Sequence, residues 1–142
     1  AIEASPPIPA PPPTVATRRA RILVIDDEPL IGRAIRRILK DHDVAVVHRA
    51  IDGLAHIRAG EHVDLIVCDV MMPELSGMDV HAELARSAPA LLDRILFATG
   101  GTFTPSAQHF LSRPDIRYID KPIDAKTLRD VVARLLAEHP RT

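Results

Sequence analysis

The sequence has one cysteine, no strong charge imbalance and no long apolar run, and each of these features excludes a class of protein. With one Cys in 142 residues, a framework of internal disulfides is excluded, and a reducing cytoplasm is the expected location. The 18 basic residues nearly balance the 19 acidic ones, so we expect no contact with nucleic acid or with an anionic membrane. No apolar run approaches the ~20 residues of a membrane-spanning helix, and the N-terminus lacks the basic start and apolar block of a signal peptide.

What is present is the composition of a folded domain preceded by a tether. The chain is 46% hydrophobic, which suits one globular domain with a real core. Residues 1–17 hold six of the 13 prolines, so we expect an extended linker there and a folded domain over residues 18–142. A docking motif for a proline-reading domain is the alternative for the first segment. Because the chain begins with Ala rather than Met, we expect it to be part of a longer protein.

Short apolar runs alternate with segments of helical periodicity from Arg18 onward. The runs predict five strands with a helix after each, and Asp52 is the expected N-cap of the second helix. Five βα units in series predict an α/β fold, a doubly wound parallel sheet with helices on both faces. The expected strands are residues 22–25, 44–47, 65–68, 95–98 and 118–119, and the expected helices lie near residues 30–39, 53–60, 78–87, 106–111 and 128–136.

Polar or charged residues follow four of the five predicted strands. In open α/β sheets, ligands bind beyond the carboxyl ends of the strands, at the point where the strand order reverses. We therefore expect these side chains to converge in one site. They are Asp26, Asp27 and Glu28 after the first strand, Asp69 after the third, Thr99 after the fourth and Lys121 after the fifth.

This set of side chains has the chemistry of a metal-assisted phosphoryl acceptor. Carboxylates that meet in one place repel one another unless a cation joins them, and Mg²⁺ prefers oxygen ligands such as carboxylates, a main-chain carbonyl and water. A carboxylate beside that cation can act as the nucleophile that forms an aspartyl-phosphate. The cation and the Lys121 ammonium would hold the phosphoryl oxygens, and the Thr99 hydroxyl would add a hydrogen bond.

Each of these residues also has an ordinary structural interpretation when it is taken alone. Asp26 and Asp27 suit the N-terminus of the following helix, where acidic side chains favour the macrodipole. Thr99 alone is an ordinary strand-end residue, and Lys121 alone is an ordinary surface lysine. Cys68 ends the third strand, but strand alternation directs it away from the site, so we expect a small core residue. The joint placement of the polar groups after four strands favours the site.

Four segments resemble the signature regions of one bacterial family, the receiver domains of response regulators. They are ILVIDDEP, LIVCDVMMPELSG, LFATGG and YIDKP, and they occur in the order that the family has. The resemblance covers about residues 20–138. It implies a flavodoxin-like sheet with strand order 2-1-3-4-5 and five helices, and a cis peptide bond between Lys121 and Pro122.

The resemblance also implies a role for each site residue. Asp69 would be the phosphoacceptor, assisted by Thr99 and Lys121. Thr99 would also act as the switch hydroxyl, and the rotamer of Tyr118 would follow it. The bound cation would be Mg²⁺ or Mn²⁺, and its ligands would be Asp26, Asp27, Asp69 and the main-chain carbonyl of Met71.

The implied function is phosphotransfer signalling. A histidine kinase or a histidine phosphotransfer domain would be the partner that donates a phosphoryl group to Asp69, and the phosphorylated domain would change conformation. The face formed by the fourth helix, fifth strand and fifth helix would carry this change and could form a homodimer. The Pro-rich linker and the segment FATGGTFTPSAQHFL resemble the C-terminal receiver of a hybrid sensor histidine kinase, and a stand-alone regulator is the alternative.

Three other classes of protein fit the sequence less well. An interaction module of the same fold that works without phosphorylation would have lost part of the acidic, hydroxyl and lysine set, whereas this chain keeps all of it. A phosphatase of the haloacid-dehalogenase class needs a second Asp two positions after its nucleophile, where this chain has Met71. A dinucleotide-binding domain needs G-x-G-x-x-G after its first strand, and that motif is absent.

Overall fold

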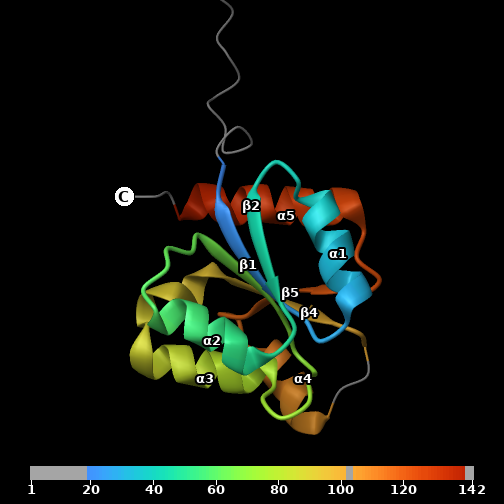
Figure 1. The fold of residues 1–142 in the computed structure, drawn as a ribbon. Coiled ribbons are helices and arrows are strands. Elements are labelled where there is room, and N and C mark those ends of the chain that lie inside the picture. Colours follow the sequence, from blue (N-terminus) through green and yellow to red (C-terminus); the bar gives the residue numbers. More distant parts are fainter. Residues whose placement is uncertain (1–18, 102–103, 140–142) are drawn as a thin grey trace, which may run out of the picture.

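Five parallel strands form the centre of the molecule, with helices packed on both faces of the sheet (Figure 1). The computed structural model describes residues 19–101 and 104–139, so the predicted linker over residues 1–17 lies outside the described part. The sheet order is β2-β1-β3-β4-β5, which confirms the predicted doubly wound α/β fold and its strand order. The strands are β1 (Arg21–Ile25), β2 (Asp43–Val47), β3 (Leu65–Asp69), β4 (Ile95–Thr99) and β5 (Arg117–Asp120).

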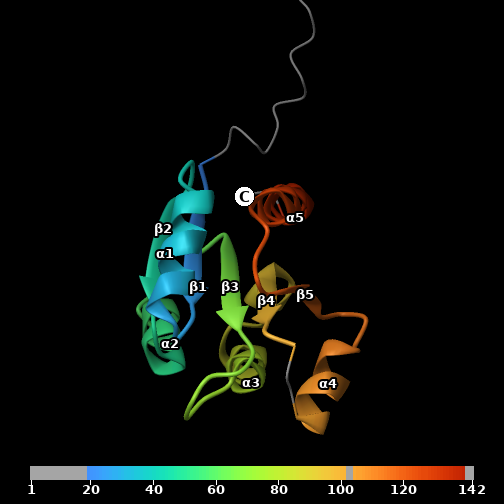
Figure 2. The same ribbon diagram turned by 90° about the vertical axis from the view of Figure 1, so that its right-hand side faces the viewer.

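Two helical layers enclose the sheet, as the view along it shows (Figure 2). α1 and α5 cover one face, and α2, α3 and α4 cover the other. Among the described helices, none has the length and apolar character needed to span a bilayer. The helices are α1 (Pro29–Ile38), α2 (Ala50–Arg58), α3 (Gly77–Ser87), α4 (Pro105–Leu111) and α5 (Ala125–Glu138), and a short 3-10 helix, η2 (Pro89–Arg94), follows α3.

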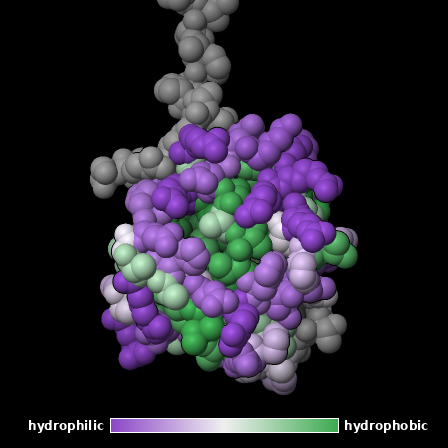
Figure 3. Space-filling view, viewed as in Figure 1, coloured by the Kyte–Doolittle hydropathy of each residue, from purple (hydrophilic) through white to green (hydrophobic). Residues whose placement is uncertain are grey.

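The continuous apolar runs form the central strands, because these strands are covered on both faces. Every residue of β3 and β4 is buried, and so is all of β1 except Arg21. Alternate residues of β1 enter opposite halves of the core: Ile22 packs toward α1 and α5, and Leu23 packs toward α2 and α3. The edge strand β2 is only half-buried, and apolar surface gathers over it, between hydrophilic surroundings (Figure 3).

Two details of the helices differ from the sequence-based expectations. The predicted N-cap at Asp52 is wrong, because α2 begins earlier, at Ala50, with Arg49 as its N-cap. The main-chain N–H groups of Asp52 and Gly53 already donate to the Arg49 carbonyl, at 3.1 and 3.2 Å. Asp52 therefore lies in the first turn, where its negative charge still suits the helix dipole. The 3-10 helix η2 was not predicted.

The first turn of α3 lies directly against the carboxyl end of β3. The start of this helix is held by a capping box, in which Ser76 and Asp79 satisfy each other's main-chain N–H groups. A Cβ atom at Gly77 would lie 2.7 Å from the main-chain oxygen of Asp69 and 3.0 Å from the Cα atom of Val70. Only glycine permits this approach, so the helix fixes the backbone at the end of β3.

Candidate functional site

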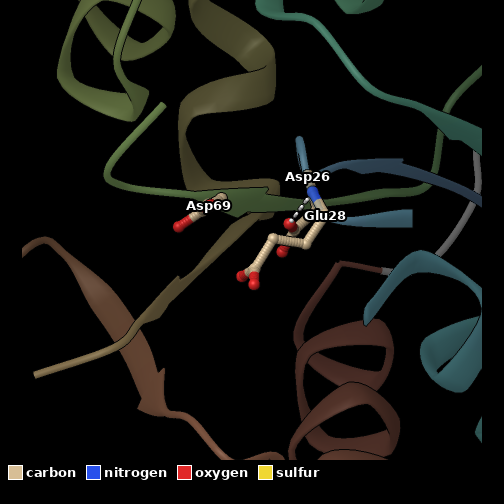
Figure 4. Close-up of side chains that lie close together, drawn as sticks. All are labelled: Asp26, Glu28 and Asp69. Atoms are coloured by element: carbon tan, nitrogen blue, oxygen red, sulfur yellow. Dashed lines mark hydrogen bonds between the residues drawn. The ribbon is translucent and has the colours of Figure 1, made fainter. Parts of the chain in front are cut away.

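The carboxyl ends of the strands bring three carboxylates and one ammonium group together, as the sequence predicts in outline. Lys121 Nζ lies 3.0 Å from Asp26 Oδ2, 3.2 Å from Glu28 Oε1 and 3.4 Å from Asp69 Oδ2. One carboxylate oxygen each from Asp26, Glu28 and Asp69 lies within 4.8 Å of the others (Figure 4). The side chains come from the β1 end, the β3 end and the loop after β5, so residues far apart in sequence form one charged cluster.

Asp69 is a buried carboxylate among charges of both signs. Only 4% of the residue is exposed, and its Oδ1 accepts a hydrogen bond from the N–H of Met71 at 3.3 Å. Burial and the negative charge of Asp26 raise the pKa of Asp69 to about 7, although Lys121 opposes the shift. A nearby cation would favour the ionised form of this group.

Asp26 is fixed through its backbone and one of its carboxylate oxygens. Its N–H donates to the Val47 carbonyl at 3.1 Å, and its Oδ1 accepts from the N–H of Glu28 at 2.9 Å. Its Oδ2 is buried and, within the described chain, makes the ion pair with Lys121 but no well-directed hydrogen bond. This oxygen is therefore available to a cation.

Lys121 supplies the positive charge of the site. The main-chain N–H of Lys121 donates to the Thr99 carbonyl at 2.7 Å. This bond attaches the loop after β5 to the end of β4. Burial alone would lower the pKa of Lys121, but the contacts with Asp26, Asp69 and Glu28 together raise it above its usual value. The peptide bond between Lys121 and Pro122 is cis, which confirms the expectation from the resemblance.

The remaining predicted residues occupy different positions around the cluster. Asp27 and Met71 line the open pocket at the site, together with Gly100. The side chain of Asp27 adds to the rise of the Asp69 pKa. Asp27 is not one of the three carboxylates that converge; Glu28 takes that position.

The two predicted switch residues do not line this pocket. Thr99 is fully buried at the end of β4, and its Oγ1 accepts a hydrogen bond from the N–H of Gly101 at 3.3 Å. Tyr118 lies on the edge strand β5, and 45% of the residue is exposed. Cys68 is buried in the core, as predicted, and burial together with the Asp69 and Asp26 charges raises the pKa of its thiol. It is therefore an unreactive packing residue.

Sequence reasoning named Glu28 but gave it no role. It follows Asp26 and Asp27 in the same acidic run, and the structure directs its carboxylate at Lys121, where it accepts a hydrogen bond at 3.2 Å. The signal for it was present as a third acidic residue after β1. Which members of such a run face the pocket depends on the backbone at the start of α1, which the residue types do not specify.

The oxygen-only cluster fits a hard divalent cation. Mg²⁺ is held in proteins by one or two carboxylates and water. The converging groups here are carboxylates, and the buried Oδ2 of Asp26 accepts no well-directed hydrogen bond within the described chain. A cation would also offset the repulsion among these acids, because within residues 19–101 and 104–139 only Lys121 places a positive charge within 4 Å of them. The arrangement is suited to placing an anionic group between an ammonium and a metal ion.

Comparison with known proteins places these residues in a wider context. The family described as "Response regulator receiver domain" matches residues 22–133. The transcriptional regulatory protein DltR of Streptococcus agalactiae is 35% identical over 111 residues, which are 76% of this chain and 48% of DltR. The chain thus spans about half the length of that relative.

Solved structures of the same kind of domain superimpose over most of the chain. A response regulator receiver domain protein from Clostridium thermocellum has a TM-score of 0.72 and 27% identity, and the match covers 84% of this chain and 95% of that one. The signal receiver domain of a signal transduction histidine kinase from Syntrophus aciditrophicus has a TM-score of 0.71 and 26% identity, and covers 87% and 94%.

Proposed function

Because the chain belongs to the family of response regulator receiver domains, we propose that it accepts a phosphoryl group on Asp69 from a phosphohistidine. The observation that carries this proposal is the position of Asp69, whose carboxylate is buried beside Asp26 and lies 3.4 Å from the Lys121 ammonium. The Lys121 ammonium beside this carboxylate can neutralise the negative charge of an incoming phosphoryl group.

The proposed reaction is a displacement at phosphorus. An oxygen of the Asp69 carboxylate forms the new O–P bond while the N–P bond of the phosphohistidine breaks, and the imidazole nitrogen keeps the electron pair of that bond. Lys121 neutralises negative charge on the phosphoryl oxygens. The domain thereby catalyses its own phosphorylation, and water can later hydrolyse the product. In this proposal the chain is a signalling domain that turns over a single phosphoryl group at a time.

The proposed cofactor is Mg²⁺ or Mn²⁺. Asp26, Asp27, Asp69 and the main-chain carbonyl of Met71 would hold it, and the buried Oδ2 of Asp26 supports this assignment. When bound, the cation would neutralise charge on the phosphoryl oxygens and on the acids themselves.

The proposed partners are a histidine kinase or a histidine phosphotransfer domain. Phosphorylation would then bias two conformations, with the Thr99 hydroxyl turning toward the phosphoryl group and Tyr118 changing its exposure. The face formed by α4, β5 and α5 would carry this change and would be the surface for a homodimer. The partial exposure of Tyr118 on this face supports that role.

The proposed context is the cytoplasmic C-terminal receiver of a hybrid sensor histidine kinase. The domain would extend over residues 18–142 and follow the Pro-rich linker of residues 1–17. The similarity to the receiver domain of a histidine kinase from Syntrophus aciditrophicus supports this context. A stand-alone regulator is the alternative, and the neighbouring domains of the full-length protein decide between them.

The test is phosphorylation by a small donor such as acetyl phosphate with Mg²⁺, read by intact mass. We expect the wild-type protein to gain the mass of one phosphoryl group, and we expect chelation by EDTA to prevent it. Asp69→Asn should gain no mass while its circular dichroism spectrum stays unchanged. A wild-type protein that takes no label under conditions that label another receiver would contradict the proposal and favour a module that works without phosphorylation.

A further inference from the structure

We infer that Glu28 is a positioning residue, which holds the Lys121 ammonium in the resting domain and must release it before Lys121 can bind the phosphoryl group. This inference rests on the proposed function. Glu28 is one of the three converging carboxylates, but the proposed function gives it no role as phosphoacceptor or metal ligand.

The Lys121 ammonium has carboxylates as its close neighbours, and among the described residues its one well-directed hydrogen bond goes to Glu28. An ammonium group has three N–H donors and no acceptor. Lys121 Nζ has three acidic neighbours within 3.4 Å, namely Asp26, Glu28 and Asp69. A phosphoryl oxygen that approaches Lys121 therefore competes with these three carboxylates for the ammonium group.

Glu28 is the neighbour whose displacement costs least. The side chains of Asp26 and Asp69 are 2% and 5% exposed, so a carboxylate separated from its cation there stays buried. The Glu28 side chain is 61% exposed, and water would solvate its carboxylate as soon as the contact breaks. The ammonium would thus pass from Glu28 to the phosphoryl group, while Asp26 stays in place.

The contact between Glu28 and Lys121 is directed, not incidental. It has the geometry of a hydrogen bond from Nζ to Oε1, and it joins residues 93 positions apart. Glu28 is the N-cap of α1, yet its side chain makes no hydrogen bond to the helix. Its N–H donates to Asp26 Oδ1, and its carbonyl accepts from the N–H groups of Ile31 and Gly32. The backbone of Glu28 is thus held by the start of the helix, while its carboxylate serves Lys121.

The consequence is a restraint on phosphorylation. Removing the Glu28 charge should free Lys121 for the phosphoryl group and speed the reaction. Because the Glu28 side chain is largely exposed, loss of its contact with Lys121 corresponds to a change of about two- to fivefold in the rate of labelling. We therefore expect Glu28→Gln to be phosphorylated by acetyl phosphate about two- to fivefold faster than the wild-type protein.

Two further variants separate positioning from general charge effects. Glu28→Asp keeps the negative charge but shortens the side chain by one methylene, so its carboxylate cannot reach Lys121 from the same backbone. Glu138→Gln is the matched control, since Glu138 is an exposed acid that pairs with Arg117, a residue at the amino end of β5. The measurement is the initial rate of labelling by intact mass, at fixed Mg²⁺ and acetyl phosphate, for the wild type and the three variants.

The inference predicts that Glu28→Gln and Glu28→Asp are both faster than the wild type and that Glu138→Gln is not. If Glu28→Gln is faster but Glu28→Asp matches the wild type, the effect is one of overall charge and the positioning role is wrong. Labelling of Glu28→Gln at the wild-type rate, or more slowly, also overturns it. A wild-type protein that takes no label at all overturns the proposed function and this inference together, so the two failures are distinguishable.

Discussion

The two ends of strand β3 each carry a buried aspartate, and they differ in how the carboxylate is satisfied. At the amino end, Asp64 Oδ2 accepts a hydrogen bond from the main-chain N–H of Arg21 at 2.8 Å, and Asp64 Oδ1 lies 2.9 Å from His62 Nε2. At the carboxyl end, Asp69 accepts one main-chain N–H at 3.3 Å and faces Asp26 across the cluster. The first carboxylate has directed donors for both oxygens and joins β1 to β3. The second has the carboxylates of Asp26 and Glu28 beside it, and the Lys121 ammonium at 3.4 Å supplies positive charge that offsets them.

This comparison shows how burial can serve stability at one end of a strand and chemistry at the other. A buried carboxylate with directed donors stabilises the fold, because removing it leaves those donors without partners. A buried carboxylate among other acids has a raised pKa and binds cations or reactive groups. Four experiments test the difference.

Removing the Lys121 ammonium group at the Asp69 end should have the largest effect on the rate of phosphorylation. Lys121→Met should slow phosphorylation by acetyl phosphate by about 100-fold or more, since loss of one electrostatic stabiliser of a transition state commonly has this effect. Lys126→Met is the matched control, because Lys126 is an exposed lysine of α5 that pairs with Asp130. Labelling rates by intact mass check the prediction, and equal rates for both variants would contradict it.

Adding Mg²⁺ should stabilise the protein through the Asp69 end alone. At a free Mg²⁺ concentration 100 times the Kd, binding to the folded state raises the free energy of unfolding by about 2.7 kcal/mol. We expect this gain in the wild type and in Asp64→Asn, and we expect it to shrink in Asp26→Asn and in Asp27→Ala. Urea denaturation with and without Mg²⁺ measures it. A full gain in Asp26→Asn would place the cation elsewhere.

Removing the Asp64 carboxylate at the amino end of β3 should lower the stability of the fold and leave the rate of phosphorylation unchanged. Asp64→Ala leaves the Arg21 N–H without the acceptor it has in the wild type, and this should lower the free energy of unfolding by about 1–3 kcal/mol. The folded fraction should still be labelled at the wild-type rate. Urea midpoints and labelling rates together check this, and a stability equal to that of the wild type would remove the contrast between the two ends.

The pH dependence of stability should reflect Asp69. Its pKa rises from 3.8 to about 7 in the folded protein, so between these values the folded state binds a proton that the unfolded state does not. The stabilising contribution of this proton is complete below about pH 4 and is lost as the pH rises through about 7. We expect Asp69→Asn to flatten this part of the stability curve, measured by urea denaturation in EDTA. An unchanged slope would mean that Asp69 does not titrate in this range.

Much of the fold follows from simple patterns in the sequence. Four-residue apolar runs such as 65–68 predict buried parallel strands, and the helical spacing between them predicts the layers. The start of α2 was misjudged, because an aspartate in the first turn and an aspartate at the N-cap produce the same sequence signal. The 3-10 helix η2 was missed, since six residues beginning with Pro89 are too few to show a periodicity.

The site was predictable to the level of the strand ends and no further. The convergence of Asp26, Asp69 and Lys121 follows from the topology of a parallel sheet, which brings the carboxyl ends of its strands to one edge. Whether Asp27 or Glu28 joins Asp26 at Lys121 depends on the backbone dihedral angles at the start of α1, where Glu28 is the N-cap. The outward position of Tyr118 depends on β5 being an edge strand, and residue type alone does not determine it.

The glycine at the start of α3 carries a lesson for protein engineering. Gly77 contributes no charge and no donor side chain to the pocket, yet the main-chain oxygen of Asp69 lies only 2.7 Å from where the Cβ atom of any other residue would be. Transplanting only the acids and the lysine onto another scaffold would therefore omit a steric requirement. A graft of the site should therefore also include glycine at this position, because the absence of a side chain allows α3 to approach the end of β3 closely.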